Sequence, residues 1–186
     1  MTLNYGELKR GTSVELDGEP YSVVEYEHSK MQGRAPVMKI RFRSLRTGKV
    51  LDRTFQGDVK FSLAQVERRK AQYIYRDGDL FYFMDTESFE QFPMSEDQIK
   101  ESLKFLKEQM ELDLIFFEEN PISLELPLNV ELKVIDSPPG VKGDTAQGAT
   151  KLAKLETGLE ISVPLFVNEG DILKVNTRSG EYISRA

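Results

Sequence analysis

Short strand-like runs separated by turn residues fill most of this sequence, and they constrain its fold more than any other feature. In the first third the runs lie at 13–16, 21–26, 37–44 and 50–55. Turns such as Asp17-Gly18 and Thr47-Gly48 separate them and supply the positive φ that tight hairpins need. Many short strands with few helices are typical of small barrels and sandwiches. The sequence therefore predicts an all-β, mainly β fold.

The rest of the chain continues this pattern with one helical interruption. Strand-like runs lie at 71–75, 80–84, 112–117, 122–126, 130–135, 160–164, 172–176 and 182–184. After Ser95, a residue type that caps helices, apolar residues recur every three or four positions, at Ile99, Leu103, Leu106 and Met110. This spacing predicts one short helix in the middle third, whose apolar stripe plugs or covers a small barrel core.

Charge is distributed unevenly along the chain. Turn signals divide it at 63/64 and 127/128, into segments with 11 basic and 8 acidic residues, then 7 and 15, then 7 and 8. The net charges are therefore +3, −8 and −1, which sum to the −6 of the whole chain. A domain of about 60 residues buries only about 60% of its unfolded surface. We therefore expect three small domains, at 1–63, 64–127 and 128–186, that pack against one another.

The composition argues against several classes of function. The 186 residues include no Cys and one His, so they offer no disulfide, no thiolate zinc site and no cysteine nucleophile. Neither a phosphate-cradling glycine motif nor a nucleophile elbow occurs. We expect a non-enzymatic protein without metal or cofactor. Because no stretch approaches the roughly 20 apolar residues of a membrane span, we also expect a cytoplasmic protein with no membrane partner.

The basic residues of the first third gather in one stretch. Residues 28–51 contain no acid and seven cations: Lys30, Arg34, Lys39, Arg41, Arg43, Arg46 and Lys49. Within the run 37–44 these cations alternate with apolar residues, so Lys39, Arg41 and Arg43 are expected to point the same way along a strand. Such a row is either a solvated strand face or a surface that neutralises RNA phosphates.

Several segments then resemble one family. They are Leu16-Asp-Gly-Glu-Pro-Tyr21, Leu45-Arg-Thr-Gly48, Phe89-Glu-Gln-Phe92, Pro139-Gly-Val-Lys-Gly-Asp-Thr-Ala146, the stretch 151–167 and the ending Thr177-Arg-Ser-Gly-Glu-Tyr-Ile-Ser-Arg185. Together they span the chain, which resembles bacterial elongation factor P. The resemblance implies an N-terminal KOW/SH3-like barrel followed by two OB-folds, in an L-shaped arrangement that mimics tRNA.

The resemblance also implies a function. Members of the family bind the 70S ribosome, its RNA and proteins, between the P and E sites and contact the peptidyl-tRNA. There they stimulate peptide bond formation and relieve stalling at consecutive prolines. We expect a monomer that contributes positioning while ribosomal RNA supplies the chemistry.

Site residues follow by position. The loop 30–36 takes the place of the family's tip beside the peptidyl-tRNA, with Lys30, Gly33 and Arg34 at the tip. Ungapped alignment puts Gly33 at the position that relatives modify and Arg34 one residue beyond it. Arg34 is therefore the candidate cation, and a modifying enzyme is a candidate partner.

Other positions carry over in the same way. Gly143, Asp144 and Thr145 match a loop that contacts the small subunit and the exit-site codon, and Lys39, Arg41 and Arg43 would lie along RNA backbone. Near the C-terminus, Arg178, Tyr182 and Arg185 either support RNA contact or serve a structural hairpin. Competing interpretations are an elongation-factor-P-like paralogue, a general RNA-binding or acidic protein-interaction module, and an enzyme with an acidic cleft in the middle domain.

Overall fold

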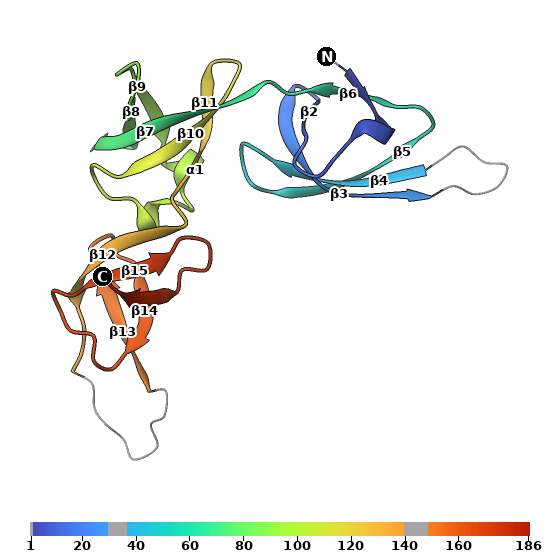
Figure 1. Cartoon of the computed structure of the whole chain (residues 1–186). Coiled ribbons are helices and arrows are strands. Elements are labelled where there is room, and N and C mark those ends of the chain that lie inside the picture. The colour runs from blue at the N-terminus through green and yellow to red at the C-terminus, as the bar shows by residue number, and fades with distance from the viewer. Residues whose placement is uncertain (1, 30–36, 140–148) are drawn as a thin grey trace. The chain divides into compact units, whose positions relative to one another are not determined.

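The computed structural model describes residues 2–29, 37–139 and 149–186, and these form three curled β-sheets (Figure 1). The chain divides into two compact units, one made of residues 1–69 and 114–124 and the other of residues 70–113 and 125–186. Helices are confined to a few short turns. The prediction of an all-β fold is therefore confirmed.

The first sheet contains six strands. They are β1 (Thr2–Asn4), β2 (Ser13–Leu16), β3 (Glu19–Ser29), β4 (Val37–Ser44), β5 (Val50–Gln56) and β6 (Lys60–Leu63), in the order β1-β6-β2-β3-β4-β5, and a 3-10 turn (Tyr5–Glu7) follows β1. Asp17 and Gly18 connect β2 to β3 with φ of 55° and 79°. Two positive φ values in a two-residue loop match the twist of a hairpin, which explains why this dipeptide marks the turn.

One aromatic side chain organises the core of this sheet. Phe42, on β4, is fully buried among the apolar residues of β2, β3 and β6. Its ring lies 6.2 to 6.4 Å from the rings of Tyr21, Phe55 and Phe61, an arrangement that adds to simple burial. The alternate residues Met38 and Ile40 are also buried, so one row of β4 forms the core.

The other two sheets repeat a single topology. The second contains β7 (Val66–Asp77), β8 (Leu80–Asp85), β9 (Gln91–Ser95), β10 (Glu111–Phe117) and β11 (Asn120–Glu125), in the order β11-β10-β7-β8-β9. The third contains β12 (Asn129–Asp136), β13 (Thr150–Leu155), β14 (Glu160–Pro164), β15 (Ile172–Asn176) and β16 (Tyr182–Arg185), in the order β14-β13-β12-β15-β16. In both, the first strand is central, with the second and third strands on one side and the fourth and fifth on the other.

The predicted helix after Ser95 is much shorter than its apolar periodicity suggests. Only α1 (Glu96–Ile99) is helical, and a separate 3-10 turn, η2 (Leu103–Phe105), follows. Further on, the backbone N–H of Gln109 donates to Tyr73 O at 2.8 Å, and Met110 O accepts from Tyr73 N at 2.9 Å. Because β7 captures these backbone groups, they cannot continue a helical ladder. Of the four stripe residues, Ile99, Leu106 and Met110 are nevertheless buried and Leu103 is half-buried. Phe105, which the stripe does not include, is buried as well.

Some strand boundaries also differ from the sequence pattern. The polar residues 27–29 lie outside the strand-like run 21–26, yet they belong to β3 because Ser29 pairs with Val37 and Glu27 with Lys39. The sequence pattern does not predict β1, β6, β9 or β13. These strands have three to six residues.

Polar contacts join the turn region after α1 to the third sheet. The Thr157 hydroxyl donates to Lys104 O at 2.7 Å, and the Lys107 ammonium donates to Glu131 O at 2.8 Å. Lys107 also lies 3.7 Å from a carboxylate oxygen of Glu156. These contacts lie within one compact unit.

Candidate nucleic-acid interface

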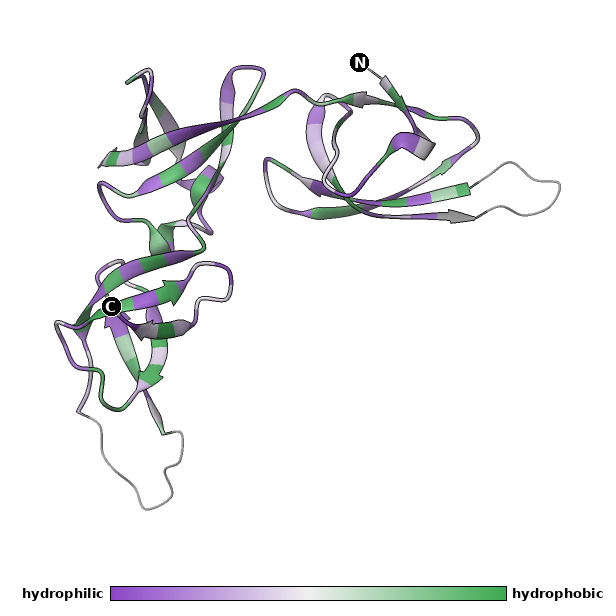
Figure 2. Ribbon diagram, viewed as in Figure 1, coloured by the Kyte–Doolittle hydropathy of each residue, from purple (hydrophilic) through white to green (hydrophobic). Residues whose placement is uncertain are grey.

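The cations of β4 occupy the outward row of the strand, as the alternation predicts. Lys39, Arg41 and Arg43 are exposed while the residues between them are buried. Figure 2 shows hydrophilic and hydrophobic residues alternating along β4. The three side chains therefore share one face of the first sheet.

Carboxylates from both neighbouring strands lie on the same face. Arg41 donates from Nε to Asp52 Oδ1 at 2.9 Å and from Nη2 to Asp52 Oδ2 at 3.2 Å. Its Nη1 lies 3.5 Å from Glu25 Oε2, and Arg10 lies 3.6 Å from the other oxygen of Glu25. An acid-free stretch of sequence thus becomes a strand whose central cation is held between two acids.

The pKa values of the pair move in the directions expected of a hydrogen-bonded ion pair. The hydrogen bond to Asp52, helped by its negative charge, raises the pKa of Arg41 above its usual value. The hydrogen bond from Arg41 lowers the pKa of Asp52 below its usual value. The N–H donors of Arg41 that could bind a phosphate are therefore already paired with carboxylates.

A β-bulge in β3 creates this arrangement. Tyr21, Ser22 and Val23 pair with Ser44, Arg43 and Phe42, but the register then shifts by one residue so that Glu25 faces Arg41. Without the extra residue, Val24 would lie opposite Arg41. Because side chains alternate between faces, the one-residue shift moves Glu25 and Glu27 onto the cation face.

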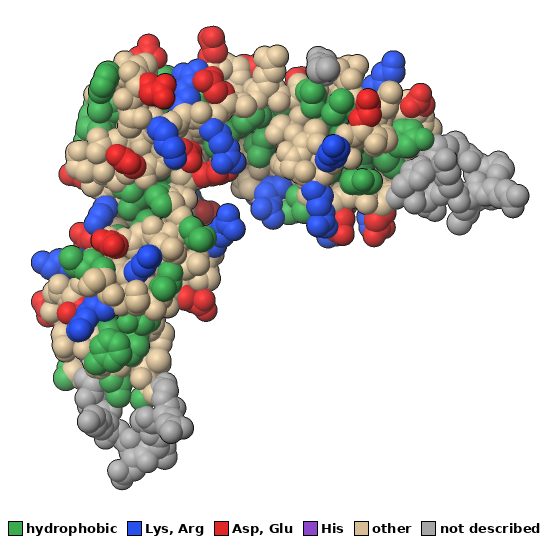
Figure 3. Space-filling view, viewed as in Figure 1, with side chains coloured by type: hydrophobic (Ala, Val, Ile, Leu, Met, Phe, Trp, Pro, Cys, Tyr) green, Lys and Arg blue, Asp and Glu red, His purple; other side chains and the backbone are tan. Residues whose placement is uncertain are grey.

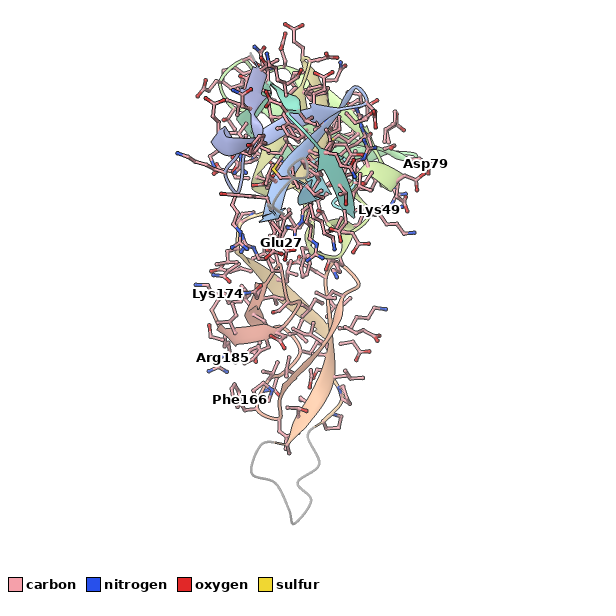
Figure 4. The ribbon with its side chains drawn as sticks, turned by 90° about the vertical axis from the view of Figure 1, so that its right-hand side faces the viewer. Glu27, Lys49, Asp79, Phe166, Lys174 and Arg185 are labelled. Atoms are coloured by element: carbon pink, nitrogen blue, oxygen red, sulfur yellow. The ribbon has the colours of Figure 1, made fainter. Side chains whose placement is uncertain are left out.

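The remaining cations of the basic stretch differ in their surroundings. Arg46 pairs with Glu19 at 2.8 Å. Within the described part of the chain, Lys39, Arg43 and Lys49 form no such pair (Figure 4 labels Lys49). Figure 3 shows basic and acidic side chains interspersed on the visible face of the first sheet. Lys39, Arg43 and Lys49 are consequently more available to an anionic ligand than Arg41.

The loop between β3 and β4 contains the predicted tip, and Lys30, Gly33 and Arg34 lie outside the described residues. Its two ends are nevertheless fixed. β3 and β4 stay paired in register from Glu25 opposite Arg41 to Ser29 opposite Val37. The seven residues 30–36 therefore connect two strand ends that are adjacent in the ladder.

The predicted contact loop of the third sheet is similar in this respect. Gly143, Asp144 and Thr145 lie outside the described residues, between β12 and β13. The strands that flank the loop pair with each other, and the Lys151 ammonium donates to Pro138 O at 2.9 Å near its base. In OB-folds, the loop between the first and second strands belongs to the surface that binds oligonucleotides.

The C-terminal motif forms a turn with structural hydrogen bonds. The Asn176 side-chain oxygen accepts from the backbone N–H groups of Arg178 and Ser179, and Gly180 has φ of 75°. The Thr177 hydroxyl donates to Pro127 O at 2.7 Å. These contacts support the structural role that the sequence left open for this hairpin.

The three side chains proposed near this hairpin are not brought together in one site. Arg178 is exposed on the turn, and Tyr182 is half-buried at the start of β16. Arg185, at the other end of β16, lies 3.8 Å from Asp171 and 5.9 Å from the ring of Phe166 (Figure 4). Sequence reasoning missed Phe166 because a single aromatic residue between strands carries no periodic signal.

No group of three or more His, Asp or Glu side chains in the described ranges has the arrangement of a metal site. Across the same residues, none of the helices reaches the length and apolar character that crossing a bilayer requires.

Family models cover nearly the whole chain. The model described as Elongation factor P (EF-P) KOW-like domain matches residues 4–61, the Elongation factor P (EF-P) OB domain matches 66–124, and Elongation factor P, C-terminal matches 130–185. With the three sheets described above, these matches define a translation factor built from KOW-like and OB-type β-barrels.

Similar sequences carry one name. The elongation factor P of Carboxydothermus hydrogenoformans is 45% identical over 98% of this chain and 99% of its own length. That of Moorella thermoacetica is 45% identical over 99% of this chain and 100% of its own length. The chain belongs to the elongation factor P family and is a translation elongation factor.

Solved structures share the fold at lower identity. Translation initiation factor 5A from Methanococcus jannaschii has a TM-score of 0.56 at 21% identity, over 68% of this chain and 92% of its own. A protein of the same initiation factor family from Naegleria fowleri has a TM-score of 0.53 at 16% identity, over 68% of this chain and 98% of its own. At these identities the likeness concerns the fold alone.

Proposed function

We propose that this elongation factor binds the ribosome between the P and E sites and relieves stalling at consecutive prolines. The loop 30–36 would lie beside the CCA end of the peptidyl-tRNA, with Lys30, Gly33 and Arg34 at its tip. The observation that best supports this proposal is the pairing of β3 and β4 up to Ser29 and Val37. A loop that positions a substrate needs a rigid base, and two paired strands provide one.

The physical role of the tip is positional. The ring of proline fixes its φ, so it is a conformationally restricted partner in peptide transfer. A cation beside the tRNA end would hold the tRNA and the nascent chain closer to the reactive geometry, which lowers the entropic part of the barrier. Arg34 is the cation that we assign to this role, and the modification state of the tip would adjust its reach.

The third domain would hold the factor on the small subunit. Gly143, Asp144 and Thr145 would contact exposed RNA, since a short Gly-Asp-Thr loop can hydrogen-bond base edges and ribose hydroxyls. Its place between the first and second strands of an OB-type sheet supports this assignment. We also retain the division into domains 1–63, 64–127 and 128–186 and their tRNA-like arrangement as part of the proposal.

The outward face of β4 would follow RNA backbone only in part. Arg43 and Lys39 are the cations that we assign to phosphate contact, because two carboxylates already hold Arg41. A binding constant that does not vary with salt would contradict any phosphate contact by this face.

The test of the tip is a consecutive-proline reporter in reconstituted translation. Arg34→Ala should reduce rescue of a Pro-Pro-Pro reporter while ribosome binding stays mostly intact, because the tip acts after docking. Arg53→Ala is the matched control, since Arg53 belongs to the same sheet and pairs with Asp17. Full rescue by Arg34→Ala would contradict the assignment.

A second variant tests the small-subunit loop separately. Replacing Asp144 and Thr145 together with Ala should weaken ribosome binding, measured by co-sedimentation, and reduce rescue in proportion. If affinity and rescue both stay at the wild-type level, the loop does not touch RNA.

A further inference from the structure

The outward face of the β7-β8-β9 ladder carries aromatic and apolar side chains where a solvent-facing sheet would carry charges. Tyr75, Tyr82 and Pro93 lie opposite one another across the three strands. The rings of Tyr75 and Tyr82 are stacked, with centroids 4.6 Å apart and planes 10° from parallel. Tyr75 is 40% exposed, so the stack lies at the surface.

The sequence of β8 indicates that this face should be covered. The strand begins with five apolar residues in a row, Leu80 to Met84. Phe81 and Phe83 are buried in the core, whereas Leu80 is 39% exposed and Tyr82 and Met84 are half-buried on the other side. A strand that is apolar on both faces is typical of a sheet covered on both faces. On the outward face, Tyr75 and Leu80 remain exposed.

Acidic residues flank both ends of the row. Asp77 and Asp79 are exposed at the turn between β7 and β8, where Figure 4 labels Asp79. Glu87 and Glu90 are exposed at the opposite end of β8, in the connection to β9. The segment 64–127 as a whole has 7 basic and 15 acidic residues. Phosphates would be repelled here, and a cationic partner would be attracted.

We propose that the outward face of β7, β8 and β9 docks an arginine-containing basic segment of a protein. A guanidinium group stacks well on a tyrosine face, and the stacked pair holds two rings in a fixed orientation. The flanking carboxylates would pair with further cations of the segment. This surface is separate from the loop 30–36 and from the outward face of β4, and it does not depend on the ribosomal site proposed above.

The stack is held in place before any partner arrives. A bulge in β7, between Tyr73 and Tyr75, shifts the register so that Tyr75 faces Tyr82. On the inner side, Tyr73 packs on Phe81 and Phe83 with ring centroids 5.9 and 5.5 Å away. A preorganised aromatic surface loses little side-chain freedom on binding, which favours its use as an interface.

The test is a titration of the full chain with a short synthetic peptide of alternating arginine and glycine. Binding is followed by NMR shifts of the tyrosine rings. Tyr82→Ser should weaken binding about fivefold, and Tyr82→Phe should retain it, because the ring face and not the hydroxyl makes the contact. Tyr26→Ser is the matched control, since Tyr26 is a 45% exposed tyrosine on β3.

Charge is tested by a second pair of variants. Asp79→Asn should weaken binding of the peptide and reduce the salt dependence of that binding. Asp58 is an exposed acid before β6, and Asp58→Asn should change neither quantity. Retained near-ultraviolet circular dichroism in each variant shows that the sheet is intact.

Several outcomes would overturn the proposal. These are equal losses for Tyr82→Ser and Tyr26→Ser, equal affinity for a matched lysine peptide, and displacement of the arginine peptide by a short single-stranded RNA at the same rings. Because the titration contains no ribosome, its result is independent of whether the proposed ribosomal site is correct.

Discussion

The outward faces of β4 in the first sheet and β8 in the second are both shaped by a β-bulge in the neighbouring strand, but one face is charged and the other is aromatic. Each faces a strand with a single β-bulge, in β3 between Val23 and Glu25 and in β7 between Tyr73 and Tyr75. The bulge in β3 brings an acid onto Arg41, and the bulge in β7 brings an aromatic ring onto Tyr82. The first face therefore already pairs its central cation, Arg41, while the second leaves apolar area exposed.

The two faces differ in how much free energy a bound partner can gain. An anionic ligand at Arg41 must displace Asp52 and Glu25, so part of its binding energy is lost in breaking existing ion pairs. A ligand on the Tyr75-Tyr82 stack displaces only water and buries apolar surface. A basic run in the sequence thus does not by itself indicate that its cations are free.

The largest expected effect is a loss of stability when a buried, inward-facing ring of β4 or β8 is removed, and it should be similar for the two strands. Phe42→Ala in β4 and Phe83→Ala in β8 should each lower the free energy of unfolding by about 3–5 kcal/mol, since both rings are fully buried. Native-state hydrogen exchange at the amides of β4 and β8 reports each sheet separately. A loss below about 1 kcal/mol in either would show that its core repacks.

The next effect separates the outward rows. Asp52→Asn should remove the shorter of the two ion pairs of Arg41 and leave the 3.5 Å contact with Glu25. It should raise affinity for 70S ribosomes and steepen the dependence of log K on log salt by about 0.7–0.9, as one added phosphate contact does. Asp17→Asn is the control, because it frees Arg53 on the opposite row of β5. An unchanged salt slope would mean that Arg41 makes no contact with RNA even when Asp52 no longer pairs with it.

A smaller effect is expected from the tyrosine stack. In a double-mutant cycle of Tyr75→Ala and Tyr82→Ala, the coupling free energy should be about 0.5–1.5 kcal/mol, the usual value for an aromatic pair. Urea unfolding followed by circular dichroism measures it. No coupling would indicate that the rings are adjacent by register alone.

The smallest effect is a difference in pH response. Asp52 has a lowered pKa, so its contribution to stability is full above its unfolded value of 3.8 and decreases as pH falls below that value toward the folded pKa. Tyr73 has a raised pKa, chiefly because it is buried. Its contribution is full below the unfolded value of 10.0 and decreases as pH rises above it.

One variant for each residue tests these two pH dependences, with stability measured as the urea midpoint at a series of pH values. Asp52→Asn should remove part of the acid-side decrease and Tyr73→Phe part of the alkaline-side decrease. Should either variant change the opposite limb instead, the assignment of that limb to its residue is wrong.

Much of the fold follows from local pattern. The strands Val37–Ser44, Glu160–Pro164 and Ile172–Asn176 lie where alternation and turns predict them, because residues within one strand encode its two faces. The short helix after Ser95 is present but ends earlier than its periodicity indicates, since periodicity cannot reveal that Tyr73 binds the backbone of Gln109 and Met110. The site was partly predictable: the outward cations of β4 were, and their carboxylate partners were not.

The sequence by itself determined which residues share a face of each strand, where the hairpins turn, and that the chain belongs among β-barrel translation factors. The tertiary structure decided which strands face each other and in what register. That choice placed Glu25 on Arg41 and Tyr75 on Tyr82 through one extra residue in each case. The reason is physical: side-chain direction is a property of one strand, whereas register depends on the pairing of two.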